Sequence, residues 1–203
     1  MIALDHIVIT SANPKKAAQE FAKKHQVVAV QGGKHQNWGT WNWLCHFNND
    51  CYLEWIGIFD NSIAQESENP LIQNVVKALN AGLENIVQLA FRTDQIDVLK
   101  SDLIQFGHSV IGPVPGSRSL SDGSTLEWQM LFTVSDSNHP LPFFIEWGEK
   151  LPGSDIDLNQ QRISHITVPE IDRQYYEQLL GKDNPLANTK LNFGTSFKYN
   201  IVN

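Results

Sequence analysis

Cysteine is scarce in this sequence, and its placement excludes the common structural zinc sites. Cys45 and Cys51 are the only two cysteines among 203 residues, and they lack C-x-x-C spacing. A zinc knuckle is therefore excluded. The two residues flank a polar turn and could face each other across a hairpin, but two reduced thiols in a cytoplasmic protein are the favoured interpretation.

Basic residues and long apolar runs are scarce as well. The chain has 15 Lys and Arg against 22 Asp and Glu, a net charge of −7. This balance argues against nucleic acid or an anionic membrane as a main partner, because both require a basic face. No apolar stretch approaches the roughly 20 residues that span a bilayer, and residues 1–10 lack the basic region of a secretory signal. We therefore expect a cytoplasmic globular protein.

Familiar catalytic motifs are also missing. The Gly32-Gly33 pair is not followed by G-K-[ST], so it is not a P-loop. The chain has no G-x-S-x-G motif and no Cys–His pattern that indicates a nucleophile.

The sequence does contain a carboxylate in the middle of an apolar run, and it does so twice. FFIEWGE (143–149) carries Glu146, and CYLEWIGI (51–58) carries Glu54 in the same L/I-E-W setting. An unpaired buried carboxylate costs several kcal/mol. Either these residues face solvent on half-buried strands, or both face a shared polar site.

A threefold internal repeat organises the chain. Residues 4–10, 85–93 and 162–168 each read as a strand followed by a helix-like segment, and aligning them places His6, Gln88 and His165 at one equivalent position. His165 has no partner Glu in its own unit, so a structural role is expected for it.

Helix signals follow the first two strands. Asn13 is a predicted N-cap with Pro14 at the first helical position. In the second unit Asp94 is a predicted cap and Gly107 a stop. The apolar stripe of that helix consists of Ile96, Leu99, Leu103 and Phe106.

The fold class is predicted to be α+β, with two β-α-β-β-β modules and a partial third. Further strands are expected around 27–31, 40–47 and 51–58 in the first module, and around 108–112, 125–134 and 142–148 in the second. The expected units are 1–60 (first module), 61–83 (a helical connection), 84–150 (second module) and 151–203 (strand, helix and further strand).

Strand alternation predicts which residues meet. Ile7, Ile9, Val87, Leu89 and Phe91 share the face that packs under the helices. His6 and Gln88 point to the opposite face. If the outer strands curl into a cup, His6, Gln88, Glu54 and Glu146 converge inside it.

Five motifs in order resemble one known family. LDHIVI, GGKHQNWGTWNWL, YLEWIG, PGSRSLSDGSTLEWQ and PFFIEWGE together resemble the glyoxalase-like domain family of the vicinal oxygen chelate superfamily, which includes glyoxalase I and extradiol dioxygenases. The resemblance covers residues 1–150 well and the remainder loosely. It implies paired β-α-β-β-β modules and metal ligands at His6, Glu54, Gln88 and Glu146.

Such a ligand set has a coherent chemistry. Two carboxylates, a His and a Gln balance a divalent cation such as Zn, Ni, Mn or Fe and leave positions open for a substrate's adjacent oxygens. Glu54 or Glu146, released from the metal, could act as the catalytic base next to a carbonyl. No organic cofactor is indicated. The alternative is a hydrogen-bonded polar cup without a metal.

Three further residues are candidates for substrate binding. His35 follows two glycines that can bring the backbone close to a ligand, although these glycines also suit an ordinary turn. Asn42 shares a strand face with Thr40 and can hydrogen-bond in the cup. Arg118 lies in a Gly-, Pro- and Ser-rich stretch that we expect to form a lid loop, where its planar fork suits an anion.

Two functions remain open at this stage. One is a metal-dependent lyase, isomerase or dioxygenase acting on a small substrate with vicinal oxygens. The other is a non-catalytic binding protein of the drug-sequestering, bleomycin-resistance kind, in which Trp side chains form the pocket walls. Both have a small molecule as partner, and the sequence leaves a homodimer open.

Overall fold

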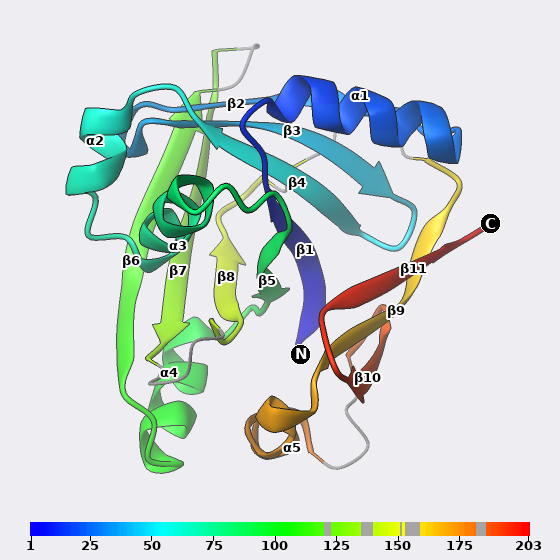
Figure 1. The fold of residues 1–203 in the computed structure, drawn as a ribbon. Helices are drawn as coiled ribbons and strands as arrows, with labels where there is room; N and C mark the ends of the chain where they lie inside the picture. Colours follow the sequence, from blue (N-terminus) through cyan, green and yellow to red (C-terminus); the bar gives the residue numbers. More distant parts are fainter. Residues whose placement is uncertain (120–122, 135–139, 151, 153–158, 182–185) are drawn as a thin grey trace.

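The computed structural model contains a curled eight-stranded sheet, helices packed on it and a second, three-stranded sheet (Figure 1). It describes residues 1–119, 123–134, 140–150, 152, 159–181 and 186–203. This architecture confirms the predicted α+β class. Within the described part of the chain, no helix is long and apolar enough to cross a membrane.

The first five elements form a β-α-β-β-β unit. They are β1 (Ala3–Thr10), α1 (Pro14–His25), β2 (Val30–His35), β3 (Thr40–Phe47) and β4 (Cys51–Ile58), with a short 3-10 helix over Gln36–Trp38. The N-cap prediction for α1 is confirmed, because the Asn13 side chain accepts a hydrogen bond from the Lys16 N–H at 3.1 Å.

A second unit with the same element order follows two connecting helices. The connection consists of α2 (Asn61–Glu66) and α3 (Pro70–Asn80), and Asn69 caps α3 by accepting from Leu71 N–H at 2.9 Å. The unit itself comprises β5 (Ile86–Arg92), α4 (Ile96–Gln105), β6 (Val110–Ser119), β7 (Thr125–Thr133) and β8 (Phe143–Trp147).

The two units share one sheet. Its strand order is β2-β3-β4-β1-β5-β8-β7-β6, with β1 parallel to β4, β5 parallel to β8, and β1 antiparallel to β5. The order therefore reads the same outward from the central β1–β5 pair in both directions, as expected for two repeated units.

The C-terminal part forms a smaller sheet beside the first (Figure 1). It contains β9 (Arg162–Pro169), α5 (Arg173–Leu180), β10 (Lys190–Gly194) and β11 (Lys198–Val202) in the order β10-β9-β11. His165 lies on the central strand, where its Nδ1 contacts Ser164 Oγ at 2.9 Å. The structural role expected for His165 stays a prediction.

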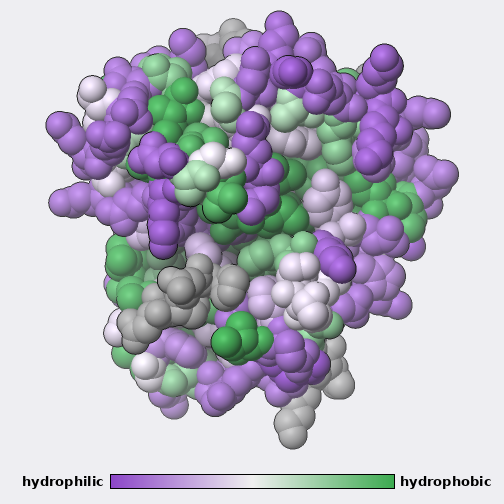
Figure 2. All heavy atoms as spheres, viewed as in Figure 1, coloured by the Kyte–Doolittle hydropathy of each residue, from purple (hydrophilic) through white to green (hydrophobic). Residues whose placement is uncertain are grey.

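Each face of the large sheet has its own apolar core. Ile7, Leu89 and Phe91 pack with residues of α1, α4 and α5, as predicted, whereas Val87 belongs to the opposite core. That opposite, concave core contains Val8, Ile56, Ala90, Phe143 and Ile145, and α3 covers it with Leu71, Ile72, Val75 and Ala78. On the face that Figure 2 shows, hydrophilic residues predominate around the edge and hydrophobic residues are visible between them.

Glu146 does not line the inner cavity of the cup, and the prediction that placed it there is wrong. Phe143, Ile145 and Trp147 line the inner cavity of the cup, so the intervening Glu146 points to the other face of β8. There its Oε2 accepts a hydrogen bond at 2.8 Å from the N–H of Ile96, the first residue of α4. Glu146 is thus tolerated in an apolar strand because its carboxylate accepts a hydrogen bond from a backbone N–H at the start of α4 that has no acceptor within the helix.

The same contact corrects the predicted cap of α4. Asp94 makes no cap; its Oδ1 instead contacts the N-terminal amine of Met1 at 3.0 Å. A carboxylate 50 residues away along the chain takes its place. Ile96, Leu99 and Leu103 are buried as predicted, whereas Phe106 is exposed.

Removing the Glu146 carboxylate should lower the free energy of unfolding by about 1 kcal/mol, because a helix N–H loses its acceptor. Urea denaturation of Glu146→Ala measures this loss. Glu146→Gln keeps an acceptor and should lose less, and Glu149→Ala at an exposed neighbouring position is the control. Equal stability of Glu146→Ala and Glu149→Ala would contradict the capping role.

Candidate functional site

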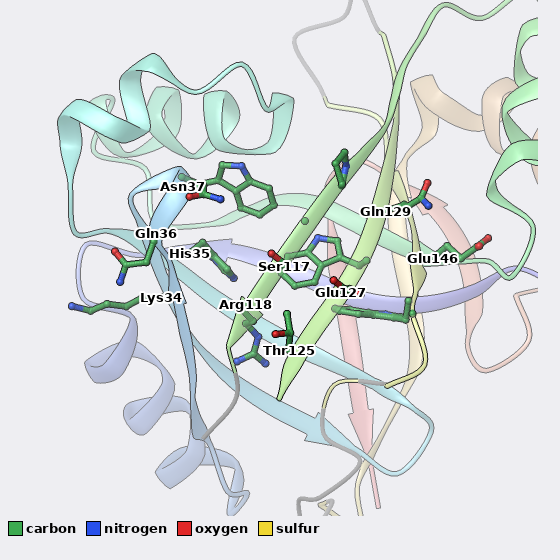
Figure 3. A pocket seen from close by; sticks show the side chains of 16 residues that line it. Lys34, His35, Gln36, Asn37, Ser117, Arg118, Thr125, Glu127, Gln129 and Glu146 are labelled. Atoms are coloured by element: carbon green, nitrogen blue, oxygen red, sulfur yellow. The ribbon is translucent and has the colours of Figure 1, made fainter. Parts of the chain in front are cut away.

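A cleft opens between the two ends of the curled sheet. Its volume is about 1040 Å³, and Lys34, His35, Gln36 and Asn37 face it from one side, with Arg118, Thr125 and Glu127 on the other (Figure 3). The cleft continues into an inner cavity of about 40 Å³, which reaches His6, Asn42 and Glu54. The residues common to both spaces are His35, Trp38, Arg118, Trp128 and Trp147.

Arg118 lies at the mouth of the cup, on a strand instead of a lid loop. The stretch predicted to be a loop forms β6 up to Ser119, while residues 120–122 lie outside the described residues. Arg118 Nη1 donates a hydrogen bond of 2.7 Å to the carbonyl of Gly32 on β2. Because β2 and β6 are the two edge strands of the sheet, this bond links its opposite ends.

The two glycines of β2 serve this close approach. A Cβ on Gly32 would collide with the Asn42 side chain, and one on Gly33 would lie 2.9 Å from Arg118 Nη1. The predicted turn is not formed, since both residues lie within a strand. Because the two glycines lack side chains, Asn42 and Arg118 can lie close to the backbone of β2.

Asn42 and Glu54 form a buried pair on adjacent strands. Asn42 Nδ2 donates to Glu54 Oε1 at 2.5 Å, and Asn42 Oδ1 accepts from the Gly33 N–H at 2.8 Å. Each residue is at most 6% exposed, so the carboxylate depends on protein donors. The predicted placement of both residues inside the cup agrees with the structure.

His6 lies beside Glu54 at the bottom of the cavity. Its Nε2 is 3.3 Å from Glu54 Oε2, and its Nδ1 is 2.6 Å from Asp5 Oδ1. The ring stacks on Tyr52, with centroids 4.6 Å apart and an interplanar angle of 18°. His6 is therefore held between two carboxylates and against an aromatic ring.

Asp5 is a site residue that sequence reasoning missed. Alternation along a strand predicts that Asp5 and His6 point to opposite faces, so the Asp-His dipeptide alone does not reveal the contact. Asp5 is only 1% exposed, and its Oδ2 accepts a 2.9 Å hydrogen bond from Trp147 Nε1.

The four predicted metal ligands do not converge. Gln88 is buried, but its Nε2 donates to the Leu141 carbonyl at 2.7 Å and its Oε1 accepts from Asn74 at 3.2 Å. Glu146 lies outside the inner cavity, at the border of the outer cleft, and its Oε2 accepts from the Ile96 N–H.

Only His6 and Glu54 of the predicted set are adjacent, and no cluster of three or more His, Cys, Asp or Glu suited to a metal ion occurs among the described residues. The donor groups therefore do not fit the divalent ion that the fold family implies.

Burial changes the acid–base behaviour of the surrounding rings. Burial lowers the pKa of His35 to about 4, with Glu54 opposing and Arg118 and His6 adding to the shift. Burial likewise lowers the pKa of His46 to about 4, although nearby Asp5 opposes it. The pKa of Tyr52 is raised well above its usual value by burial, and then by Asp5 and Glu54. His35 is thus neutral near pH 7, and its Nδ1 lies 3.0 Å from Thr40 Oγ1.

The paired units and the cup between them define a vicinal oxygen chelate fold. The family model for the glyoxalase-like domain matches residues 4–181, so the chain belongs to the glyoxalase-like domain family. No curated protein matches the chain.

Solved structures share the fold at low sequence identity. A hypothetical protein from Staphylococcus aureus has a TM-score of 0.79 and 18% identity over 98% of this chain and 89% of that one. Methylmalonyl-CoA epimerase from Mycobacterium tuberculosis has a TM-score of 0.54 and 17% identity, covering 71% and 87% of the two chains.

A methylmalonyl-CoA epimerase in complex with methylmalonyl-CoA and NH4+ has a TM-score of 0.53 and 15% identity, covering 73% and 96%.

The lowered pKa values of His35 and His46 predict a loss of stability in acid. Their ordinary pKa is about 6.5, so the unfolded chain binds protons that the folded protein does not take up until about pH 4. Their contribution to stability is complete above about pH 6.5 and is lost progressively toward pH 4. Each histidine adds a slope of up to about 1.4 kcal/mol per pH unit within this window.

His46→Phe tests this expectation by urea unfolding over the same pH range. His46 Nε2 has no hydrogen-bond partner within the described structure, so a ring without nitrogens fits its place. The variant should be at least as stable as the parent in acid, with a slope reduced by up to about 1.4 kcal/mol per pH unit. An unchanged slope would exclude His46 as a source of the acid sensitivity.

Proposed function

We propose that this protein is an isomerase- or lyase-type enzyme that removes a proton next to a carbonyl of a small substrate, with Glu54 as the base. The observation that carries the proposal is the buried Glu54 carboxylate at the bottom of an accessible cavity. Asn42 fixes one of its oxygens, and the other lies beside His6 Nε2. A carboxylate in this setting is oriented before the substrate arrives, which favours proton transfer.

The entrance of the cavity suggests an anionic substrate. Arg118 lines both the cleft and the inner cavity, and Lys34 lines the cleft. A guanidinium at this depth suits a carboxylate, a phosphate or the oxygens of an enolate that forms during proton removal. That a structural neighbour binds methylmalonyl-CoA supports a substrate with a carboxylate or thioester next to the reacting carbon.

No step in this proposal passes through a metal ion. Each donor of the expected ligand set already contacts protein groups, and two of the four lie outside the inner cavity. The reaction is therefore assigned to the protein's own acid–base groups, and the dioxygenase reaction is not proposed.

Ligand binding without turnover is the second candidate, because one wall of the cavity is aromatic. The Trp128 ring centroid lies 6.0 Å from that of Trp38 and 5.4 Å from that of Trp147. Such a wall suits a flat apolar ligand. The two functions differ in whether Glu54 changes the ligand chemically or only contacts it.

Proton exchange with solvent distinguishes these functions. Small 2-oxo acids, hydroxy acids and acyl-CoA thioesters, including methylmalonyl-CoA, can be incubated with the protein in D2O and followed by ¹H NMR. We expect loss of the signal of the proton next to a carbonyl for at least one compound. Glu54→Gln should reduce the exchange rate by about 100-fold or more while tryptophan fluorescence still reports binding. Binding without exchange in the parent protein would favour the second candidate.

Arg118→Ala should weaken binding of the same compound by about 10-fold or more, because a charge-assisted hydrogen bond is lost. Its hydrogen bond to Gly32 contributes about 1 kcal/mol to stability, so the melting temperature should fall only slightly. Arg162→Ala removes an equal charge from the distant small sheet and serves as the control. Equal affinities of the two variants would remove Arg118 from the binding site.

A further inference from the structure

Asp5 is the most completely buried ionisable residue around the cavity, and it does not reach the cavity itself. It is 1% exposed and does not line the inner cavity or the cleft. Its Oδ1 lies 2.6 Å from His6 Nδ1, and its Oδ2 accepts from Trp147 Nε1 at 2.9 Å. Any effect of Asp5 on a molecule in the cavity must therefore pass through a neighbouring side chain that does line the cavity.

A local irregularity of β1 creates the contact between Asp5 and His6. Leu4 pairs with Phe91 and His6 pairs with Ala90. Asp5 is therefore an extra residue of β1 without a partner of its own in this register, which is a β-bulge. Neighbouring residues of a regular strand point to opposite faces, whereas a bulge redirects one of them. The bulge thus lets the Asp5 carboxylate meet the ring of the residue that follows it.

The second module helps to hold Asp5 in this position. Trp147 belongs to β8, and Arg92 of β5 places Nη1 3.6 Å from Asp5 Oδ2. The Arg92 cation and the Trp147 N–H therefore help to compensate a carboxylate that water does not reach.

The two ring nitrogens of His6 differ in their distance from the neighbouring carboxylates, and this difference indicates which nitrogen carries the proton of the ring. The distance from Nδ1 to Asp5 is that of a strong, charge-assisted hydrogen bond. The distance from Nε2 to Glu54 Oε2 is 3.3 Å, which is a looser contact. A ring that keeps its proton on Nδ1 presents the lone pair of Nε2 to Glu54.

We propose that Asp5 is a positioning residue that fixes the His6 imidazole as the Nδ1–H tautomer, so that Nε2 can accept the proton that Glu54 takes from the substrate. The inference rests on the proposed function of Glu54. In the step, the substrate C–H bond breaks, its electron pair moves onto the carbonyl to give an enolate, and the proton binds Glu54. The proton then passes from Glu54 Oε2 to His6 Nε2, and Asp5 stabilises the resulting imidazolium. A proton that passes back from His6 through Glu54 to the enolate carbon regenerates both groups, and the substrate shows exchange when this proton has been replaced by a deuteron from solvent.

Nitrogen-15 NMR of labelled histidine tests the tautomer without any substrate. In the parent protein, His6 should show a protonated Nδ1 and an unprotonated Nε2. Asp5→Asn should shift the ring toward the Nε2–H form, because the amide can donate to Nδ1. Asp102→Asn, an exposed carboxylate-to-amide change on α4, should leave the His6 signals unchanged.

Exchange in D2O supplies a second measurement on the same variants. Asp5→Asn should lower the exchange rate by about 100-fold or more with less than about a threefold change in ligand affinity. A general structural role would instead alter binding and stability together. An exchange rate equal to that of the parent, or a parent spectrum with His6 in the Nε2–H form, would overturn the inference.

The two measurements separate failure of this inference from failure of the proposed function. Absence of exchange in the parent protein with every compound overturns the role of Glu54, and the NMR spectrum still decides whether Asp5 fixes the tautomer. If Asp5→Asn does not fold, the parent spectrum alone decides, because the Nε2–H form is incompatible with the proposal.

Discussion

The antiparallel pairing of β1 with β5 is the constraint on which the rest of the structure depends. It joins the four strands of the first unit to the four strands of the second in one sheet. It also places His6 opposite Ala90 and Val8 opposite Gln88. The same pairing places β8, which pairs in parallel with β5, one strand away from β1. Trp147 can therefore reach Asp5, and the polar site forms at the junction of both units.

The site is asymmetric although the strand order is symmetric. The first unit supplies the acid–base groups His6 and Glu54, together with Asn42. The second unit supplies Arg118 and an apolar wall, which consists of Trp128, Met130, Phe143, Ile145 and Trp147. The register of β8 accounts for the difference, because a shift of one residue exchanges the two faces of a strand. One unit thus carries the proposed chemistry and the other the contact surface.

The sequence predicted local features well and non-local register poorly. The strands at 40–47 and 51–58 and the cap Asn13 depend on neighbouring residues only, and the structure contains them. Glu54 and Glu146 have the same L/I-E-W setting, but the face that each presents is decided by pairing with distant strands. Arg118 was expected on a loop because of nearby Pro and Gly, which an edge strand also tolerates.

The buried polar groups themselves favour a chemical role over a purely structural one. Asp5 and Glu54 are both nearly inaccessible, and removing two carboxylates from water opposes folding even when donors compensate them. Well-packed apolar side chains in the same places would stabilise the sheet at least as well. The cavity around them has further polar side chains, among them His35, Asn42 and Arg118, and α3 covers the apolar core on the concave side. Under the proposed function, the line of Glu54, His6 and Asp5 supplies a path for proton transfer, which apolar packing cannot supply.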